Sequence, residues 1–366
     1  MYPVITNTDT NNKFDDQYAF RPTGSTAAAL MAVSNHILET LCNEPYVGLV
    51  SLNFSKAFDS VRHSYLAEQL ASLPIPDHIF NWILNLLHNR SHCTRFNGVI
   101  SSLARINASI IQGSGLGPMD FVVAISDLKP VNKCNRIFKY ADDCYLAVPA
   151  SSITTTEIEL EHISVWAQSC NLKLNSSKSC EIIFTRPRGT IGMFPPPLKG
   201  IARVQTLNIL GVELTAKFGF SSHIKRLTIK ARQSFYALRI LRSHGLSGDS
   251  LFDVVRATTV GMMLYCSPVW WGFARVQERE ALEGIIRRLV RQGYLPPSSP
   301  SFETLCSNAD TRLFACILHN PCHVLHKLLP PIKQSRYSLR PRSHNRELPM
   351  FDNLSQKCFL ARMLYK

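Results

Sequence analysis

The chain has 366 residues, of which 45% are hydrophobic and 18% are charged. This length and composition exclude an intrinsically disordered chain and allow one large module or two to three smaller ones, each with a buried core. The net charge is +14, which favours acidic partners such as a phosphate backbone.

The positive charge is unevenly distributed along the chain. Residues 1–216 hold 17 Lys and Arg against 17 Asp and Glu, residues 217–291 hold 13 against 5, and residues 292–366 hold 10 against 4. The excess therefore lies in the second part of the sequence. This pattern favours a neutral body followed by a segment that binds a phosphate backbone, and a generic basic surface is the alternative interpretation.

Cysteine usage and the absence of apolar segments bear on the compartment. The 11 cysteines include no C-x-x-C pair, and the N-terminus has no basic or apolar signal region, which indicates a reduced, intracellular compartment without secretion. No apolar run approaches the ~18 residues that a membrane span needs, so we expect no membrane partner. The oligomeric state stays open.

The predicted elements alternate between strands and helices in the first half and are mostly helical in the second. Residues up to about Gln17 are polar and are expected to be loosely ordered, and Thr156 with Glu159 has the spacing of a capping box. Periodicity predicts helices at about 27–41, 66–73, 77–88, 119–128, 156–170, 222–241, 249–265 and 276–292, and strands at about 46–54, 137–148, 181–184 and 210–214.

Two adjacent carboxylates lie at the centre of the most informative stretch, Ile137–Val148. Two β-prone runs flank Asp142 and Asp143, which predicts a β-hairpin with both carboxylates at its tip. Adjacent carboxylates repel each other, and a hard cation such as Mg²⁺ would relieve that repulsion while keeping positions open for phosphate. A solvated Asp-Asp turn is the alternative interpretation.

Several further motifs occur in a fixed order around this hairpin. With them, the chain resembles the reverse transcriptase of non-LTR (LINE-type) retrotransposons, in the Jockey and chicken-repeat branch. The segments that carry the resemblance are Phe20–Thr26, Asn53–His63 (motif A), Gln112–Pro118 (motif B), Tyr140–Asp143 (motif C), Trp166 with Leu172–Asn175 and Lys178 (motif D), Leu210–Leu214 (primer grip), Leu264–Gly272 and Ser338–His344 (thumb and tail).

The resemblance implies an α+β fold with a right-hand polymerase palm, in which motifs A and C lie on adjacent strands of a β-α-β-β-α-β sheet. Residues 1–215 would form partial fingers and the palm, residues 216–294 a basic helical thumb, and residues 295–366 a partly helical C-terminal tail. The implied activity is RNA-directed DNA polymerisation by two-metal nucleotidyl transfer. The implied partners are an RNA template, a DNA primer and dNTPs, in the nucleus or a cytoplasmic ribonucleoprotein.

The resemblance also implies roles for particular residues. Asp142 and Asp143 would bind two Mg²⁺ ions, and Lys178 and the motif A position, residue 53, would complete the catalytic set. The implied substrate-binding residues are Phe54, Phe58, Gln112, Gly113 and Arg21. Phe58 would lie beneath the sugar of the incoming nucleotide and exclude a 2′-hydroxyl.

The sequence departs from the family in two places. The motif A aspartate, five residues before the aromatic Phe58, is replaced by Asn53, which offers an amide oxygen but no charge. Only 19 residues precede Phe20, so we expect an N-terminally truncated chain with incomplete fingers. Both departures predict impaired catalysis, and the alternative function is a non-catalytic nucleic-acid-binding remnant.

A zinc site in the tail is a weaker possibility. Its ligands would be Cys316, His319, Cys322, His323 and His326. Their spacing fits no standard zinc finger, and a helix at about 315–329 is the preferred interpretation.

Overall fold

The computed structural model describes residues 11–111, 113–187, 194–333 and 344–366. The chain forms two compact units, each assembled from distant stretches of sequence. Unit 1 comprises the described parts of residues 1–29, 47–183 and 191–204, and unit 2 those of residues 30–46, 184–190 and 205–366. The division into palm, thumb and tail at residues 215 and 294 stays a prediction.

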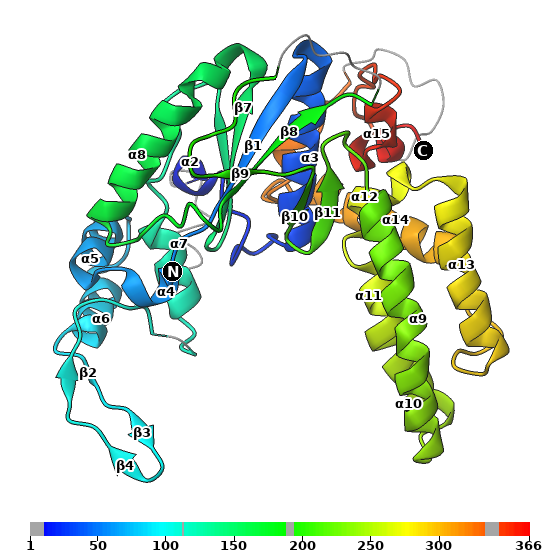
Figure 1. Cartoon of the computed structure of the whole chain (residues 1–366), viewed down its shortest axis with the longest axis horizontal. Helices are drawn as coiled ribbons and strands as arrows, with labels where there is room; N and C mark the ends of the chain where they lie inside the picture. Colours follow the sequence, from blue (N-terminus) through cyan, green and yellow to red (C-terminus); the bar gives the residue numbers. More distant parts are fainter. Residues whose placement is uncertain (1–10, 112, 188–193, 334–343) are drawn as a thin grey trace. The chain divides into compact units, whose positions relative to one another are not determined.

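Unit 1 is built on a five-stranded sheet with the order β6-β7-β1-β8-β9 (Figure 1). The strands are β1 (Tyr46–Leu52), β6 (Arg136–Tyr140), β7 (Asp143–Pro149), β8 (Cys180–Thr185) and β9 (Ala202–Arg203). Helix α7 (Gly117–Ala124) lies between β1 and β6 in the chain, and α8 (Thr156–Ser169) lies between β7 and β8. The predicted β-α-β-β-α-β palm is therefore confirmed.

One face of this sheet packs against helices. Successive side chains of a strand point to opposite faces, and Val50 and Leu52 of β1 join Leu146 of β7 in one buried cluster. Leu66 and Leu70, which lie one helical turn apart, bring another helix into the same cluster. That helix is α5 (His63–Ala71), and the other helices that contribute to the cluster are α6 (Asp77–Leu87), α7 and α8.

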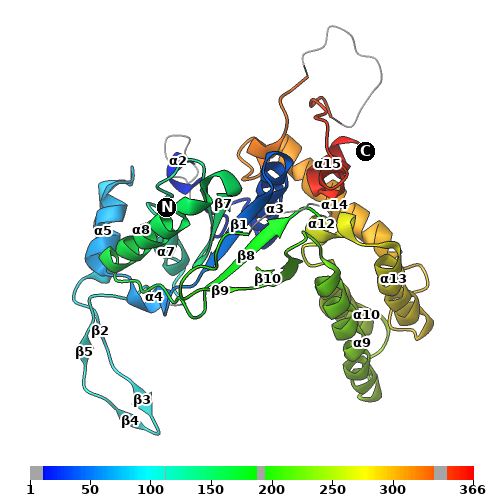
Figure 2. The same ribbon diagram turned by 45° about the horizontal axis from the view of Figure 1, so that its top comes forward.

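A narrow β arm extends from unit 1 beyond α6 (Figures 1 and 2). It contains two paired ladders: β2 (Ser91–His92) with β5 (Ala104–Arg105), and β3 (Arg95–Phe96) with β4 (Val99–Ile100). Asn97 and Gly98 connect β3 to β4 with φ values of 48° and 81°, which is the backbone of a type I′ turn. All residues from 91 to 105 are exposed, so the arm has no core of its own.

A second hairpin follows residue 204 and belongs to unit 2. Strands β10 (Thr206–Ile209) and β11 (Val212–Thr215) are antiparallel. Leu210 and Gly211 have φ values of 46° and 86°, so they form the turn. The strand expected at 210–214 is thus the second half of a hairpin, because the Leu-Gly pair adopts the left-handed backbone that a two-residue turn requires.

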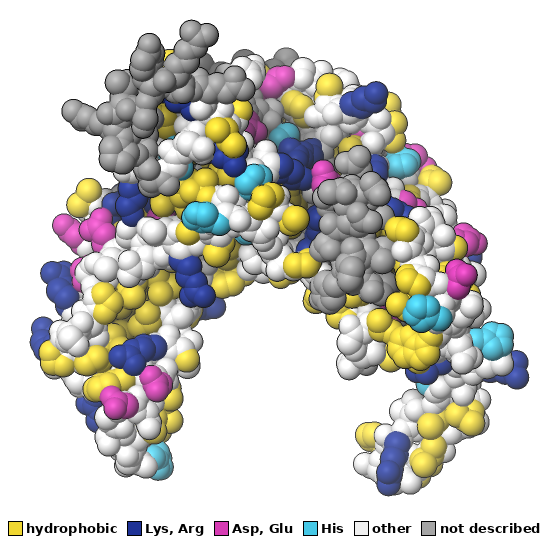
Figure 3. All heavy atoms as spheres, turned by 180° about the vertical axis from the view of Figure 1, so that it is seen from behind, with side chains coloured by type: hydrophobic (Ala, Val, Ile, Leu, Met, Phe, Trp, Pro, Cys, Tyr) yellow, Lys and Arg dark blue, Asp and Glu magenta, His cyan; other side chains and the backbone are white. Residues whose placement is uncertain are grey.

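Helices make up most of the rest of unit 2. They are α3 (Thr26–Asn43, from Leu30 onward), α9 (Ser221–Ser243), α10 (Gly248–Val255), α11 (Gly261–Leu264), α12 (Ser267–Trp270), α13 (Val276–Arg291), α14 (Phe302–His319) and α15 (Phe359–Leu364). A π-helical turn at 256–260 joins α10 to α11. Figure 3 shows Lys and Arg side chains spread over the helical part of unit 2, at the left of the view. No helix in the described ranges is both long and apolar enough to cross a membrane.

The C-terminal segment, residues 357–364, is an integral part of unit 2. The Arg362 guanidinium donates to Asp310 of α14 and, at 3.1 Å, to the Pro268 carbonyl of α12. Gly272 lies so close to the segment that a Cβ there would come within 2.0 Å of the Lys357 carbonyl oxygen. The approach of the two backbones therefore requires glycine at this position.

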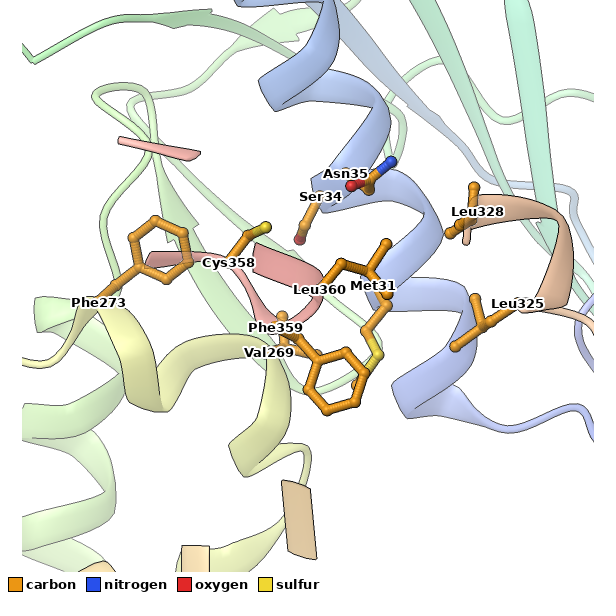
Figure 4. A pocket seen from close by; sticks show the side chains of 10 residues that line it. All are labelled: Met31, Ser34, Asn35, Val269, Phe273, Leu325, Leu328, Cys358, Phe359 and Leu360. Atoms are coloured by element: carbon orange, nitrogen blue, oxygen red, sulfur yellow. The ribbon is translucent and has the colours of Figure 1, made fainter. Parts of the chain in front are cut away.

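A small cavity of ≈ 20 Å³ remains where this segment meets α3 (Figure 4). Its lining is almost entirely apolar, and Figure 4 shows that the side chains come from α3, from α12 and the turn after it, from residues 325–328 and from the C-terminal segment. The volume is about that of one water molecule, so the cavity is a packing junction. The lining residues are Met31, Ser34, Asn35, Val269, Phe273, Leu325, Leu328, Cys358, Phe359 and Leu360.

Candidate active site

The acidic hairpin has the predicted form. Tyr140 pairs with Asp143 across β6 and β7, so Ala141 and Asp142 are the two turn residues. Ala141 has a φ of 53°, a left-handed conformation that costs an L-residue with a Cβ about 1–2 kcal/mol. Asp142 and Asp143 are both exposed at the tip. The turn therefore presents two carboxylates on a strained backbone, as functional sites often do.

A buried glutamine holds this turn. The Gln17 side-chain oxygen accepts hydrogen bonds from the backbone N–H of Tyr18 (3.1 Å), Ala19 (2.9 Å) and Ala141 (3.2 Å). The expectation of loose order up to Gln17 is wrong for residues 11–17, because this segment contains a short helix and a bridge to β6. Phe14, which is fully buried, anchors it in the core.

Beside Gln17, a buried lysine connects the N-terminal segment to the end of α7. Lys139 of β6 has no exposed side-chain surface and lies 3.2 Å from the carboxylate of Asp16, which is also 2.7 Å from Lys129. Lys139 Nζ donates to the Ile125 carbonyl at 2.9 Å. Burial lowers the pKa of Lys139 from its usual value, and the Asp16 charge opposes that effect. This network fixes β6 behind the acidic tip.

The motif A position is held beside the tip by its backbone. Leu52 pairs with Cys144 across β1 and β7, so Asn53 occupies the register position opposite Asp143. Asn53 N–H donates to Ser179 Oγ at 3.1 Å, and its carbonyl accepts from Asn175 N–H at 2.7 Å. The motif D segment therefore fixes the Asn53 backbone on both sides.

The acidic tip provides oxygen ligands, but few of them. Partial desolvation, with the charge of Asp142 as the second cause, raises the pKa of Asp143. Within the described ranges, no three His, Cys, Asp or Glu side chains come together as a metal site. The described residues of the tail likewise form no such cluster, so the possible zinc site has no support. There His319 and His326 form hydrogen bonds with the backbone carbonyls of Ala315 and Ile317.

The predicted substrate residues have different surroundings. Phe58 is half-buried and stacks on Phe121 of α7, with ring centroids 4.3 Å apart. Phe54 is 6% exposed and packs edge-on against Trp166, which is the environment of a core residue. Gly113 is exposed with a φ of 81° and open space around it, whereas Gln112 lies outside the described residues.

Two other predicted site residues bond to backbone groups of their own segments. Arg21 donates to the Phe14 carbonyl at 2.7 Å, and burial lowers its pKa. Lys178 is exposed in the turn before β8, where its N–H donates to the Asn175 carbonyl at 3.2 Å. The roles of Arg21 and Lys178 stay predictions.

A buried carboxylate that the sequence did not single out lies in the first turn of α7. Asp120 is 4% exposed, and its Oδ1 has no hydrogen-bond partner in the described part of the chain. Burial raises the pKa of Asp120 to about 7. The next residue in the chain, Phe121, carries the ring on which Phe58 stacks. The position of Asp120 between apolar residues of a buried helix is the one sequence signal that could have indicated it.

A β-α-β-β-α-β sheet whose β6–β7 hairpin presents adjacent aspartates beside the end of β1 defines the palm of a template-dependent polymerase. Residues 2–214 match the family model described as reverse transcriptase (RNA-dependent DNA polymerase). The chain therefore belongs to the reverse transcriptase family, and the family prediction made from the motifs is confirmed.

Known relatives are consistent with the LINE-type, jockey-like branch. The chain is 29% identical over 222 residues to the RNA-directed DNA polymerase from mobile element jockey of Drosophila melanogaster, covering 58% of this chain and 24% of that protein. It is 25% identical over 296 residues to the probable RNA-directed DNA polymerase from transposon BS of the same species, covering 76% and 32%. The chain thus spans about a quarter to a third of the length of these relatives.

Among solved structures, the chain is similar to telomerase from Candida Tropicalis in complex with a TWJ fragment of telomeric RNA. The TM-score is 0.47 at 11% identity, and the alignment covers 88% of this chain and 50% of that one.

Proposed function

We propose that unit 1 carries the reaction centre of an RNA-directed DNA polymerase, with an RNA template, a DNA primer and dNTPs as substrates. The observation that carries the proposal is the register that puts Asn53 opposite Asp143, beside a hairpin tip with two exposed carboxylates. The proposed location is the nucleus or a cytoplasmic ribonucleoprotein, where such substrates occur.

The family generally uses Mg²⁺, and the oxygen atoms at this tip suit a hard cation. Asp142 and Asp143 would hold the ion through their carboxylates, and Asn53 would add an amide oxygen. When bound, the metal supplies charge stabilisation at the transferring phosphate. Two divalent ions bring four positive charges against two carboxylate charges, so this set of ligands fits a pair of ions poorly. We propose that catalysis by this chain is impaired for that reason.

The basic helices of unit 2 support a role in holding nucleic acid. Lys225, Lys230 and Arg232 are exposed on α9, where they are available to phosphates. Other cations of the same region have structural tasks: Arg242 donates to the Gln292 and Gly293 carbonyls. The predicted binding by residues 217–291 therefore rests on fewer side chains than the net charge indicates, and its affinity should fall steeply with salt.

The test is primer extension on an RNA template by the wild type and by Asn53→Asp. A metal centre's charge stabilisation is worth several kcal/mol, and about 1.4 kcal/mol corresponds to tenfold in rate. We therefore expect poor extension by the wild type and a gain on the order of a hundred- to a thousandfold for Asn53→Asp. Asn and Asp have nearly the same shape, so the fold should accept both.

The matched control is Asn53→Asp combined with Asp143→Asn, which restores the charge count of the wild type while removing a tip carboxylate. It should extend no better than the wild type. Robust extension by the wild type would contradict the proposed impairment. If neither protein extends a primer but both bind RNA, the function is the alternative one, a nucleic-acid-binding remnant.

A further inference from the structure

Unit 1 contains a concave site that does not include the residues of the acidic tip. It is a cleft of ≈ 580 Å³ at the base of the β arm. Backbone hydrogen bonds fix its shape, since His63 N–H donates to the Asn107 carbonyl and Ile106 N–H donates to the Arg90 carbonyl, both at 2.9 Å. Its walls are residues 62–64 at the start of α5, residues 87–90 at the end of α6, and residues 105–107.

The charged groups of this cleft are all basic. Arg62, Arg90 and Arg105 line it together with His63 and His88, and no acidic residue does. Across the described ranges, none of the three guanidinium groups forms an ion pair or a hydrogen bond to another residue. A cleft lined by one sign of charge focuses the field and concentrates ligands of the opposite sign.

The cleft continues into a second one of ≈ 440 Å³. The two share Arg105, Ile106 and Asn107, and the second is also lined by His92 and Asp59. The joined clefts therefore contain three arginines and one acidic residue, so their lining stays net basic. We call the joined clefts, with their three arginines, the arginine trough. Three arginines spread over two joined clefts suit a chain of phosphates better than a single small anion, and guanidinium groups match phosphate oxygens in pairs.

We propose that the arginine trough binds the phosphate backbone of the RNA template strand outside the reaction centre. The preference for a chain of phosphates rests on the trough itself, whereas the identity of the strand rests on the proposed function. The net charge of the sequence does not indicate this site, because residues 1–216 have equal numbers of basic and acidic side chains.

The test compares two double variants that remove the same charge from unit 1. Arg62→Gln with Arg105→Gln changes the trough, and Lys133→Gln with Lys199→Gln changes exposed residues that do not line it. Affinity for a short single-stranded RNA is measured by fluorescence anisotropy over a range of salt concentrations, without nucleotides. Circular dichroism checks that each variant is folded.

The salt slope for single strands falls by about 0.7 for each phosphate that the protein no longer neutralises. We expect the trough variant to lower the slope by about 1.4, which is on the order of a 25-fold weaker affinity at about 0.1 M salt. The control should stay close to the wild type. Equal reductions in both double variants would overturn the proposal.

Two further arms identify the ligand. Inorganic phosphate, added at constant ionic strength, should compete weakly; full displacement of the trough-dependent RNA binding by phosphate alone would mean a small-anion site and would overturn the proposal. A slope change seen with single-stranded DNA but not with RNA would also overturn it. These measurements need no catalysis, so a failure of Asn53→Asp to extend a primer leaves a positive trough result intact.

Discussion

Replacing Asp120 with asparagine should stabilise unit 1 by an amount that depends on pH. The Asp120 carboxyl is almost fully buried, and burial raises its pKa to about 7 from the ordinary value of 3.8. The folded state therefore binds this proton more tightly than the unfolded state. The stability that follows is fully present below pH 3.8 and is lost as the pH rises to 7.

The magnitude follows from the size of this shift. One pKa unit is worth about 1.4 kcal/mol, so the raised pKa of Asp120 costs the folded state about 4 kcal/mol at pH 8, where the buried group is ionised, and about 1.5 kcal/mol at pH 5, where the group takes up a proton on folding. An asparagine side chain at this position would have nearly the same shape and no charge at either pH. The advantage of Asp120→Asn over the wild type should therefore grow by about 2–3 kcal/mol between pH 5 and pH 8.

The measurement is urea unfolding of both proteins at several pH values, followed by circular dichroism and by tryptophan fluorescence, to which Trp166 in the core of unit 1 contributes. Glu68→Gln, which neutralises an exposed carboxylate of the same unit, is the control and should show a constant difference from the wild type. A constant difference for Asp120→Asn as well would refute the reasoning, because it would mean that Asp120 is solvated or paired.

Two further predictions concern unit 2. Burial, followed by the charges of neighbouring basic residues, lowers the pKa of His223 to about 4, so the stability that neutral His223 provides is present above pH 6.5 and is lost toward pH 4. In urea unfolding, His223→Leu should therefore reduce the loss of unfolding free energy between these pH values by about 2–3 kcal/mol. Parallel pH curves for the variant and the wild type would contradict this. Gly272→Ala should push the Lys357 carbonyl away and speed hydrogen exchange in residues 357–364. Gly284→Ala, which adds a methyl group in open space on α13, should leave that exchange unchanged. Equal exchange in both variants would count against the close approach of Gly272 to the Lys357 backbone.

Elements with strong local periodicity could be predicted from the sequence. The helix expected at 222–241 is α9, Ser221–Ser243, and the strand expected at 46–54 is β1, Tyr46–Leu52. In α9 the helical spacing of apolar residues matches the buried positions, and in β1 the apolar run is buried on both faces. Local sequence and tertiary packing therefore favour the same conformation.

Sequence prediction failed where a side chain that was expected to bond within its own helix bonds to a distant segment instead. The spacing predicts that Glu159 caps its own helix, but its carboxylate accepts from Val131 N–H (3.0 Å), Asn132 N–H (2.8 Å) and Asn135 Nδ2 (2.9 Å). Glu159 is fully buried, and a buried carboxylate needs several donors. The helix expected at 315–329 is also wrong after His319, where α14 ends.

In the candidate site, too, the local features could be predicted from the sequence and the contacts between distant segments could not. The placement of Asp142 and Asp143 at a hairpin tip beside Asn53 could be predicted from the sequence, because each lies in a short motif with its own flanking strand. The support of the turn by Gln17 and the pairing of Asp16 with Lys139 could not, since these partners are more than 120 residues apart and neither segment shows a periodic pattern.

The pairing of the N-terminal segment with β6 has a consequence for solubility. β6 is the terminal strand of the sheet, and Tyr18 N–H donates to the Lys139 carbonyl at 2.9 Å while Lys139 N–H donates to the Asp16 carbonyl at 2.7 Å. An uncovered strand edge is a template on which other chains can add. Residues 16–18 thus shield the sheet from self-association, and the same few residues hold Ala141 in its left-handed turn. Loss of this segment would leave the β6 edge of the sheet open to pairing with other chains.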